Sequence, residues 1–322
     1  MNIFKRYPVL IAKIHNYHDL AKQEEISDID AAKYMIDEAK DCGINAVEFQ
    51  SFEEKSTNFS IEEYKELSEY CNEIGMIFLA TPLDYHSADL LDEFINIFKI
   101  SSVDLTNIPF VKYVASKNKP ILLFTGASTI REIKDAVNAI EDVSTVDIAI
   151  FHCVLSFPTA YDDANLLMIK DLAESFPSYE IGYSDHTVPD EHMAVLTTAY
   201  NYGARILEKN FTIDKSLPGV NNEYAMDSDD VIRFKWNVNF LSKINGMKNK
   251  QPLICESSTR KEMRKSIVAL RDIKKDAEIV YEDLTFKSPG TGIYPSEIDN
   301  VVGKIAKEDI KKDSLIDFEM LK

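Results

Sequence analysis

Two short stretches of the chain carry residue types that could hold a metal ion. The first, "IGYSDHTV" (residues 181–188), ends an apolar run with a polar group that includes His186. The second, "LEKNFTI" (residues 207–213), has the same form but presents Asn210 where a second imidazole would complete the pair. An amide is a poorer ligand for a transition metal than imidazole. The pair therefore predicts either a weakened divalent metal site or a metal-free protein.

The elements that must position these residues follow one another as strands and helices. Segments such as residues 28–43 and 128–142 have apolar residues at helical spacing after a Ser or Asp start. They alternate with short β-branched or aromatic runs, which are typical of buried strands. The strand candidates are Val9–Ile14, Ala46–Gln50, Ile77–Pro82, Phe98–Ser102, Ile121–Gly126, Asp147–Cys153, Tyr179–His186 and Arg205–Phe211.

Eight such units within residues 1–245 predict an α/β fold of the (β/α)8 TIM-barrel type. A doubly wound open sheet would also alternate, but no Gly-rich loop follows the first strand. A TIM barrel places its active site at the carboxyl ends of its strands. The polar residues expected there are Lys13, Glu48, Thr81, Lys99, Ser102, Thr125, His152, Asp185, His186, Glu208 and Asn210.

The pattern changes after the barrel. Residues 246–265 are polar and irregular, and we interpret them as a linker. Residues 266–322 contain an internal repeat, in which "DIKKDAEIVYEDL" (272–284) is echoed by "DIKKDSLIDFEML" (309–321). The repeat predicts two similar β-turn-β units in a small, mostly β domain. Between the copies, "PGTG" (289–292) indicates a tight exposed loop.

Composition narrows the classes of function. The chain has 322 residues, 36 basic and 54 acidic, and its net charge of -18 argues against binding to nucleic acid or anionic lipid. No apolar stretch reaches the roughly 18 residues of a membrane span. Four scattered cysteines without CxxC spacing are typical of reduced thiols, which predicts a cytoplasmic location. A small molecule is the expected partner.

Several motifs in order resemble the sialic acid synthase family, which makes nonulosonic acids for glycans. The likeness covers nearly the whole chain, and the tail around "KSPGTGI" is similar to the antifreeze-like SAF domain, a β-clip fold, that ends these enzymes. The segments that carry it are "VEFQSF", "TPLD", "FKISSVDLTNIP", "KPILLFTGAST", "FHCVLSFPTAYDDANL", "IGYSDHTV" and "LEKNFTIDKSLPG".

The resemblance implies a transferase that condenses phosphoenolpyruvate with an N-acetylated aldose. In that family a divalent metal, Mn or Mg, on two histidines polarises the aldehyde while C3 of phosphoenolpyruvate attacks it. Water then adds and phosphate leaves. The matched positions are Lys99, Ser102 and Ser184 for phosphate, Asp104 and Glu208 for acid–base chemistry, and His186 for the metal.

Other family positions hold different residues here. Asn210 replaces the second metal histidine, and Asn221 stands where an aspartate would hold the amino-sugar. Ser288 replaces an arginine of the tail that, in the family, reaches a neighbouring subunit's site. The resemblance still implies a domain-swapped homodimer, in which the small domain closes the partner's barrel.

The charge order of the first two strands is reversed relative to the family, with Lys13 on the first strand and Glu48 on the second. The pair predicts a salt bridge across the barrel mouth, a catalytic acid–base pair, or a Schiff-base lysine at position 13. Three functions stay open: the family synthase with an altered site, a non-catalytic binding or regulatory homologue, and a different C–C bond chemistry centred on Lys13 and Glu48.

Overall fold

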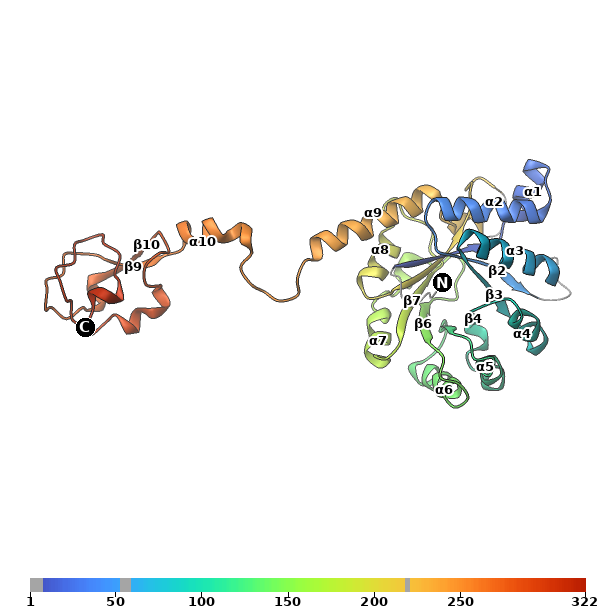
Figure 1. Cartoon of the computed structure of the whole chain (residues 1–322), viewed down its shortest axis with the longest axis horizontal. Coiled ribbons are helices and arrows are strands. Elements are labelled where there is room, and N and C mark those ends of the chain that lie inside the picture. The colour runs from blue at the N-terminus through green and yellow to red at the C-terminus, as the bar shows by residue number, and fades with distance from the viewer. Residues whose placement is uncertain (1–7, 53–58, 218–220) are drawn as a thin grey trace. The chain divides into compact units, whose positions relative to one another are not determined.

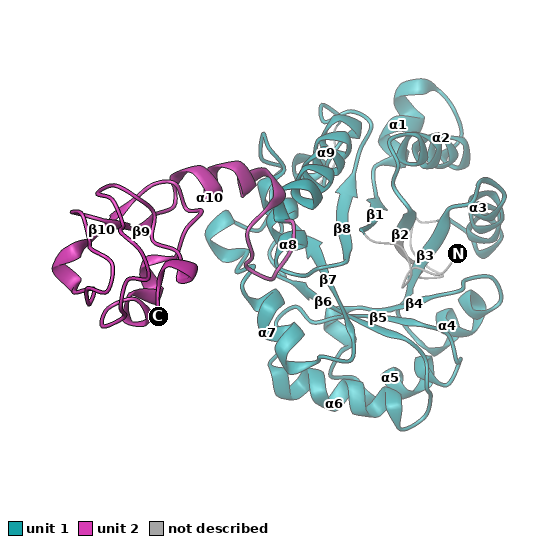
Figure 2. Cartoon of the chain, turned by 60° about the vertical axis from the view of Figure 1, so that its left-hand side comes forward, with its two compact units in different colours: residues 1–245 teal, residues 246–322 magenta. Residues whose placement is uncertain are grey.

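The chain folds into two compact units, Met1–Asn245 and Gly246–Lys322 (Figure 2). The computed structural model describes residues 8–52, 59–217 and 221–322. Each unit has a hydrophobic core of its own, so each is described by itself.

Eight parallel strands form the sheet of the first unit (Figure 1). The hydrogen-bonded order is β3-β2-β1-β8-β7-β6-β5-β4, and β3 also lies against β4, which closes the sheet into a barrel. The predicted fold is therefore confirmed. The strands are β1 (Val9–Ile14), β2 (Ala46–Phe52), β3 (Ile77–Pro82), β4 (Phe98–Ile100), β5 (Ile121–Phe124), β6 (Ile148–Cys153), β7 (Glu180–Asp185) and β8 (Ile206–Phe211).

Helices surround the strands of the barrel (Figure 1). Their starts follow local sequence: Ser27 accepts a hydrogen bond from the backbone of Asp30, and Thr129 forms a reciprocal capping box with Glu132. Their buried faces are apolar at helical spacing, as in Ile133, Ala136, Val137 and Ile140. The helices are α1 (Tyr17–Glu24), α2 (Asp28–Asp41), α3 (Ile61–Ile74), α4 (Tyr85–Asp92), α5 (Ile108–Ala115), α6 (Ile130–Glu141), α7 (Met168–Ser175), α8 (Ala194–Asn201) and α9 (Ser228–Asn245).

Alternation along the strands separates two apolar sets. Every second side chain faces the helices and joins the larger core, whereas the others fill the barrel interior. The inner set is Val9, Ile11, Ala46, Ile77, Leu79, Ile97, Leu122, Phe124, Ala149, Phe151, Cys153 and Ile206. Most of these residues lie in the amino-terminal part of their strand, so the next inward positions form the carboxyl-terminal mouth.

One strand boundary differs from the sequence prediction in a way that affects the site. The fourth strand ends at Ile100, and Ser102–Asp104 form a 3-10 turn instead of continuing the strand. The turn is closed by backbone bonds from Asp104 to Ser101 and from Leu105 to Ser102. Ser102 therefore stands on a turn above the strand end.

The second unit is small, and few of its residues lie in regular hydrogen-bonded β-strands. Strands β9 (Ser266–Ala269) and β10 (Leu284–Lys287) pair antiparallel, and isolated bridges add to them. The segment predicted as an irregular linker contains a helix, α10 (Ser257–Met263), which corrects that prediction. The helix contains Arg, Lys, Glu and Met, which are all good helix formers. The sequence prediction was wrong because it took the polar composition of this segment as a sign of irregular structure.

The internal repeat forms a nearly symmetric pair in the second unit. Ile273 and Ile310 exchange two backbone hydrogen bonds of 2.8 Å. The Asp309 carboxylate accepts from the Lys275 backbone amide at 2.8 Å, and Asp272 accepts from Lys312 at the same distance. Only the first copy leads directly into a strand, β10, whereas the second pairs through isolated bridges. The expectation of two equal β-turn-β units is therefore met only in part.

Candidate active site

A polar layer lies above the inner apolar set at the barrel mouth. On β1, Val9 and Ile11 are followed at the next inward position by Lys13, and on β8 Ile206 is followed by Glu208. Counted in the same steps of two residues, the other side chains that face the barrel interior at the mouth are Glu48, Thr81, Lys99, Ser184, His186 and Asn210. All of these except Lys13 are buried. The structure thus gathers most of the predicted site residues in one place.

The Lys99 ammonium lies at the centre of this layer between two carboxylates. Its Nζ is 2.6 Å from Oε2 of Glu48 and 2.9 Å from Oε2 of Glu208. Thr81 donates to the other Glu48 oxygen at 2.9 Å, and Ser184 donates to Oε1 of Glu208 at 2.8 Å. The ammonium also lies 4.0 Å from the ring centroid of Phe124, a cation–π distance. The partners of Lys99 are therefore provided by the protein itself.

The two carboxylates titrate differently because they share one ammonium partner. Burial alone would raise the pKa of Glu48, but the charges of Lys99 and Lys13 outweigh it and lower that pKa to about 2. Burial and the negative charge of Glu48 raise the pKa of Glu208 to about 7. Glu48 is thus the permanently ionised member, and Glu208 can gain or lose a proton near neutral pH.

Lys13 is the register partner of Glu48 on β2 and of Asn210 on β8. The ion pair of Glu48 nevertheless goes to Lys99, so the predicted Lys13–Glu48 salt bridge across the mouth is not formed. Within the described chain no carboxylate forms an ion pair with the Lys13 ammonium. Lys13 lines a cavity instead.

The cavity has a volume of about 90 Å³ and opens above the carboxylate–ammonium network. Its polar walls carry two ammonium groups, hydroxyls, an imidazole and a carboxyl group, and its other walls are apolar. The lining residues are Lys13, Lys99, Ser101, Ser102, Phe124, Cys153, Leu155, Phe157, Ser184, His186 and Glu208. A space of this size suits a phosphate or carboxylate group, not a whole sugar.

His186 is fixed in one tautomer by the neighbouring backbone. Its Nδ1 donates to the carbonyl of Val154 at 2.8 Å, so the Nε2 lone pair faces the cavity, 3.3 Å from Ser184 Oγ. The ring of Phe157 lies against the imidazole at 4.5 Å between centroids. Burial lowers the pKa of His186 to about 4, with Lys13 and Lys99 adding to that effect. The imidazole is therefore neutral at physiological pH.

The donor set does not fit a divalent cation well. Across residues 8–52, 59–217 and 221–322, no group of three or more His, Cys, Asp or Glu side chains is arranged to hold a metal ion. Asn210 directs its amide NH2 at the Asn221 carbonyl, 3.5 Å away. The two ammonium groups of the cavity add positive charge beside His186. One imidazole and one amide in a positive field make a weak site for a metal of charge two.

Asp185 and Lys209 face away from the cavity. Their side chains form an ion pair of 2.8 Å that is almost completely buried between the strands and the helices. Asp185 also accepts from Thr187 and from the Tyr183 hydroxyl, and Lys209 donates to the Thr187 carbonyl. Asp185 of "SDH" and Lys209 of "EKN" thus stabilise the packing of strands against helices, whereas their neighbours Ser184, His186 and Glu208 face the cavity.

Four other predicted residues lie at the edge of the cavity or outside it. Ser102 is at its wall, where its hydroxyl accepts from the Gly126 backbone amide at 2.9 Å. Asp104 is half-buried in the 3-10 turn, where burial raises its pKa, and it does not line the cavity. Asn221 accepts a hydrogen bond from the Tyr224 hydroxyl through its side chain. His152 points outward, stacks on Tyr183 and bonds to the Ala164 carbonyl.

Sequence reasoning missed some walls of the cavity. Phe124 supplies the ring beneath the Lys99 ammonium, and Cys153 lies 3.3 Å from the hydroxyl of Ser102. Both residues lie at positions of the predicted strands that face the barrel interior. The alternation of side chains along a strand could therefore have identified them. Ser101 lies two residues after Lys99 in the predicted strand Phe98–Ser102, so the same signal applied to it, although the strand itself ends at Ile100.

The comparisons with known proteins fit this geometry. Residues 54–250 match the NeuB family, and residues 264–322 match the SAF domain. The chain is 36% identical to an uncharacterized protein of Methanocaldococcus jannaschii, over 90% of this chain and 89% of that one. It is 33% identical to the N,N'-diacetyllegionaminic acid synthase of Legionella pneumophila, over 86% of each.

The chain is also similar to a sialic acid synthetase of known structure. The sialic acid synthetase of Leptospira borgpetersenii, in complex with citrate, superposes with a TM-score of 0.69 at 28% identity. The match covers 79% of this chain and 90% of that one. The NeuB model matches most of the barrel and the SAF model matches the second unit, so the chain belongs to the NeuB family of sialic-type acid synthases, with a carboxyl-terminal SAF domain.

Proposed function

We propose that the protein condenses phosphoenolpyruvate with an N-acetylated aldose to give a nonulosonic acid, with a rearranged set of charges in its site. The observation that carries the proposal is the cavity of about 90 Å³ at the barrel mouth. It brings the unpaired Lys13 ammonium and serine hydroxyls beside Glu208, which titrates near neutrality. These are groups that bind an anion and move a proton.

Lys13 is the proposed ligand of the substrate's phosphate or carboxylate group. The Lys99 ammonium already has two carboxylate partners and an aromatic ring, so it offers little to an incoming anion. Among the residues that the structure describes, Lys13 has no such ion-pair partner, and it faces the same cavity. Ser102 and Ser184 add hydroxyl groups on the other walls. In this arrangement Lys99 is a positioning residue that fixes the two carboxylates.

Glu208 is the proposed proton donor. As C3 of phosphoenolpyruvate forms a bond to the aldehyde carbon, the aldehyde oxygen becomes a hydroxyl and needs one proton. A carboxylic acid with a pKa near 7 is suited to give it at neutral pH. Water then adds at C2, and the C2–O bond breaks to release inorganic phosphate, which balances the reaction.

The weak donor set of the mouth leads us to propose that substrate binding does not depend on a divalent metal. The neutral His186 imidazole would then act as a hydrogen-bond acceptor through Nε2. Titration of phosphoenolpyruvate with Mn present, and again after treatment with a chelator, should give affinities that agree within about threefold, against the orders of magnitude expected for loss of an essential metal. A strong gain with Mn that is lost in His186→Ala would contradict the proposal.

One observation favours a second candidate, a binding protein without turnover. Leu155, Phe157 and Phe124 give the cavity apolar walls, which leaves fewer donors for the charge of a reacting phosphate. The deciding measurement is inorganic phosphate release from phosphoenolpyruvate with a panel of N-acetylated aldoses. Aldose-dependent release that is lost in Glu208→Gln supports the synthase. Tight phosphoenolpyruvate binding without release by any aldose supports the binding protein.

The homodimer implied by the resemblance is part of the proposal. Light scattering of the full chain should give twice the 36.6 kDa mass of one chain. A mass of one chain at micromolar concentration would contradict it. In the described parts of the chain, no helix is long and apolar enough to cross a membrane.

A further inference from the structure

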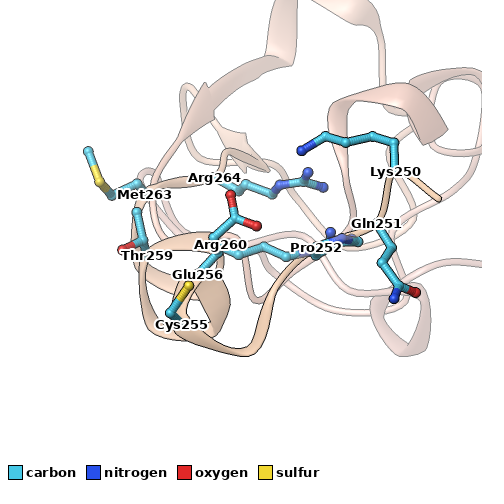
Figure 3. Close-up of a pocket in the computed structure, with 9 residues that line it drawn as sticks. All are labelled: Lys250, Gln251, Pro252, Cys255, Glu256, Thr259, Arg260, Met263 and Arg264. Carbon is cyan, nitrogen blue, oxygen red and sulfur yellow. The ribbon is translucent and has the colours of Figure 1, made fainter. Parts of the chain in front are cut away.

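The second unit contains a pocket of about 660 Å³ at the start of the chain segment that follows the barrel (Figure 3). Three of its residues are cationic, Lys250, Arg260 and Arg264, and one is acidic, Glu256. In Figure 3 the Lys250 side chain and the two arginine side chains extend toward one another from opposite sides of the view. The other lining residues are Gln251, Pro252, Cys255, Thr259 and Met263.

Within the described residues, no ion pair neutralises any of these three cations. The carboxylate of Glu256 is engaged in accepting from the Leu253 backbone amide at 2.7 Å. Five other cations of the unit do form ion pairs: Arg271–Asp283, Lys274–Asp309, Lys287–Asp313, Lys311–Asp272 and Lys322–Asp276. The positive charge of the pocket is therefore available to a ligand.

The local charge is opposite to that of the whole molecule. Residues 246–265 contain six lysines and arginines against two glutamates, in a chain whose net charge is -18. A cluster of like charges raises the free energy of the folded unit unless a counter-charge binds. A small anion entering the pocket would relieve that repulsion.

The loop that joins the two repeats supports the carboxyl-terminal end of α10, where both arginines lie. The Gly290 amide donates to the Lys261 carbonyl at 2.8 Å, and the Ser288 hydroxyl donates to the Met263 carbonyl at 3.1 Å. A Cβ at position 290 would lie 2.6 Å from the Arg264 Cβ, so glycine is required for this close approach. Arg260, within α10, and Arg264, the extended residue directly after it, therefore start from a fixed backbone.

We propose that this pocket is an anion-binding site, which takes the phosphate or carboxylate group of a small polyol. Two guanidinium forks match the oxygen geometry of these groups, and Lys250 adds a third charge. Gln251 and Thr259 supply side chains that bond hydroxyl groups. The site lies wholly in the second unit and does not depend on the reaction proposed for the barrel.

The test follows hydrogen–deuterium exchange of the full chain as inorganic phosphate is added. We expect residues 250–264 to gain protection, with an affinity that weakens at least tenfold in R260Q/R264Q. The matched control is K274Q/K311Q, which removes the same charge from paired lysines of the same unit and should leave the affinity unchanged. Phosphoenolpyruvate is the second probe, and protection around Ser184 then reports the barrel site separately.

Two results would overturn the proposal. One is a loss of affinity in the control variant equal to that in R260Q/R264Q, which would indicate only general attraction to positive charge. The other is absence of protection in residues 250–264 at millimolar phosphate. If in that case R260Q/R264Q also changed the mass measured by light scattering, the pocket would be a docking surface for an acidic protein face instead.

Discussion

At the scale of single residues, the site depends on which ammonium group is already paired. Lys99 lies between Glu48 and Glu208 at 2.6 and 2.9 Å, so the desolvation of all three groups is offset within the protein. Lys13, at the same mouth, is left for a ligand. The identities of these residues at strand ends were predictable from sequence, because barrel topology brings strand ends together. Their pairing was not, because it depends on side-chain reach across the barrel interior.

The first prediction concerns Lys13. Lys13→Met should weaken phosphoenolpyruvate binding about tenfold to a hundredfold, since a charge-assisted hydrogen bond contributes roughly 1.5–3 kcal/mol. The free energy of unfolding should change little, because the Lys13 ammonium forms no ion pair with any of the described residues. Calorimetric titration and chemical denaturation measure the two effects.

Its control is Lys119→Met, which removes the same charge next to the amino-terminal end of β5, where Lys119 pairs with Asp92. Equal weakening in both variants would mean that the effect is long-range electrostatics, and Lys13 would not be the ligand. Lys99→Met should behave in the opposite way to Lys13→Met. Lys99→Met would leave two buried carboxylates without their ion-pair partner and should lower the free energy of unfolding by about 3–5 kcal/mol.

The second prediction concerns the proton on Glu208. The folded protein holds this proton up to about pH 7, whereas the ordinary pKa is 4.5, so this group makes the fold less stable as pH rises from 4.5 to 7. The same ionisation places a negative charge beside the cavity. Sulfate, whose charge is constant over this range, should therefore bind more weakly above pH 7, with a slope approaching about tenfold per pH unit.

Glu208→Gln should abolish that slope because its amide does not ionise. His186, with a pKa lowered to about 4, stays neutral from pH 5.5 to 8.5 and should not contribute to the slope. Calorimetric titrations of both proteins across this range make the comparison. A slope that persists in Glu208→Gln would assign the proton to another group.

At the scale of elements, the two-residue alternation of each strand decides which polar residues serve the site. On β7 and β8, Ser184 and Glu208 face the barrel interior, whereas Asp185 and Lys209 face the helices. Sequence predicted these strands almost to the residue because their apolar runs are short and bounded by turns. It did not separate the two faces near Asp185, because fully buried parallel strands are apolar on both sides and show no alternation.

The third prediction follows from that separation. Lys209→Met should lower the free energy of unfolding by about 3–5 kcal/mol, because it leaves the buried Asp185 without its ion-pair partner. Asp185→Asn added to it should recover part of the loss. Sulfate affinity should stay within about twofold of the parent protein. A variant with normal stability and lost anion binding would show that the pair belongs to the site.

At the scale of the whole molecule, two separate hydrophobic cores explain why the composition changes after residue 245. The barrel has an inner and an outer apolar set, and the second unit has a smaller cluster that includes Ile273, Ile279 and Ile310. The sequence repeat was the signal for this second core. The sequence of the repeat predicted its symmetry. The two backbone hydrogen bonds between Ile273 and Ile310 were not predictable, because they depend on how the two copies pack against each other.

The last prediction tests whether the two cores unfold as separate units. Ile310 is 3% exposed, and Ile310→Ala should cost the second unit about 2–5 kcal/mol through lost burial and a cavity. Hydrogen exchange should then accelerate across residues 266–322, including the amides of Ile273 and Ile310. The amides of β6 and β7 should exchange as in the parent chain, because the apolar cluster that protects them does not include Ile310. Ile310→Val, with a smaller loss of roughly 0.5–1.5 kcal/mol, should give the same pattern in weaker form. Equal acceleration in β6 and β7 would mean that opening of the small core carries the barrel with it, and the two units would then be one cooperative structure.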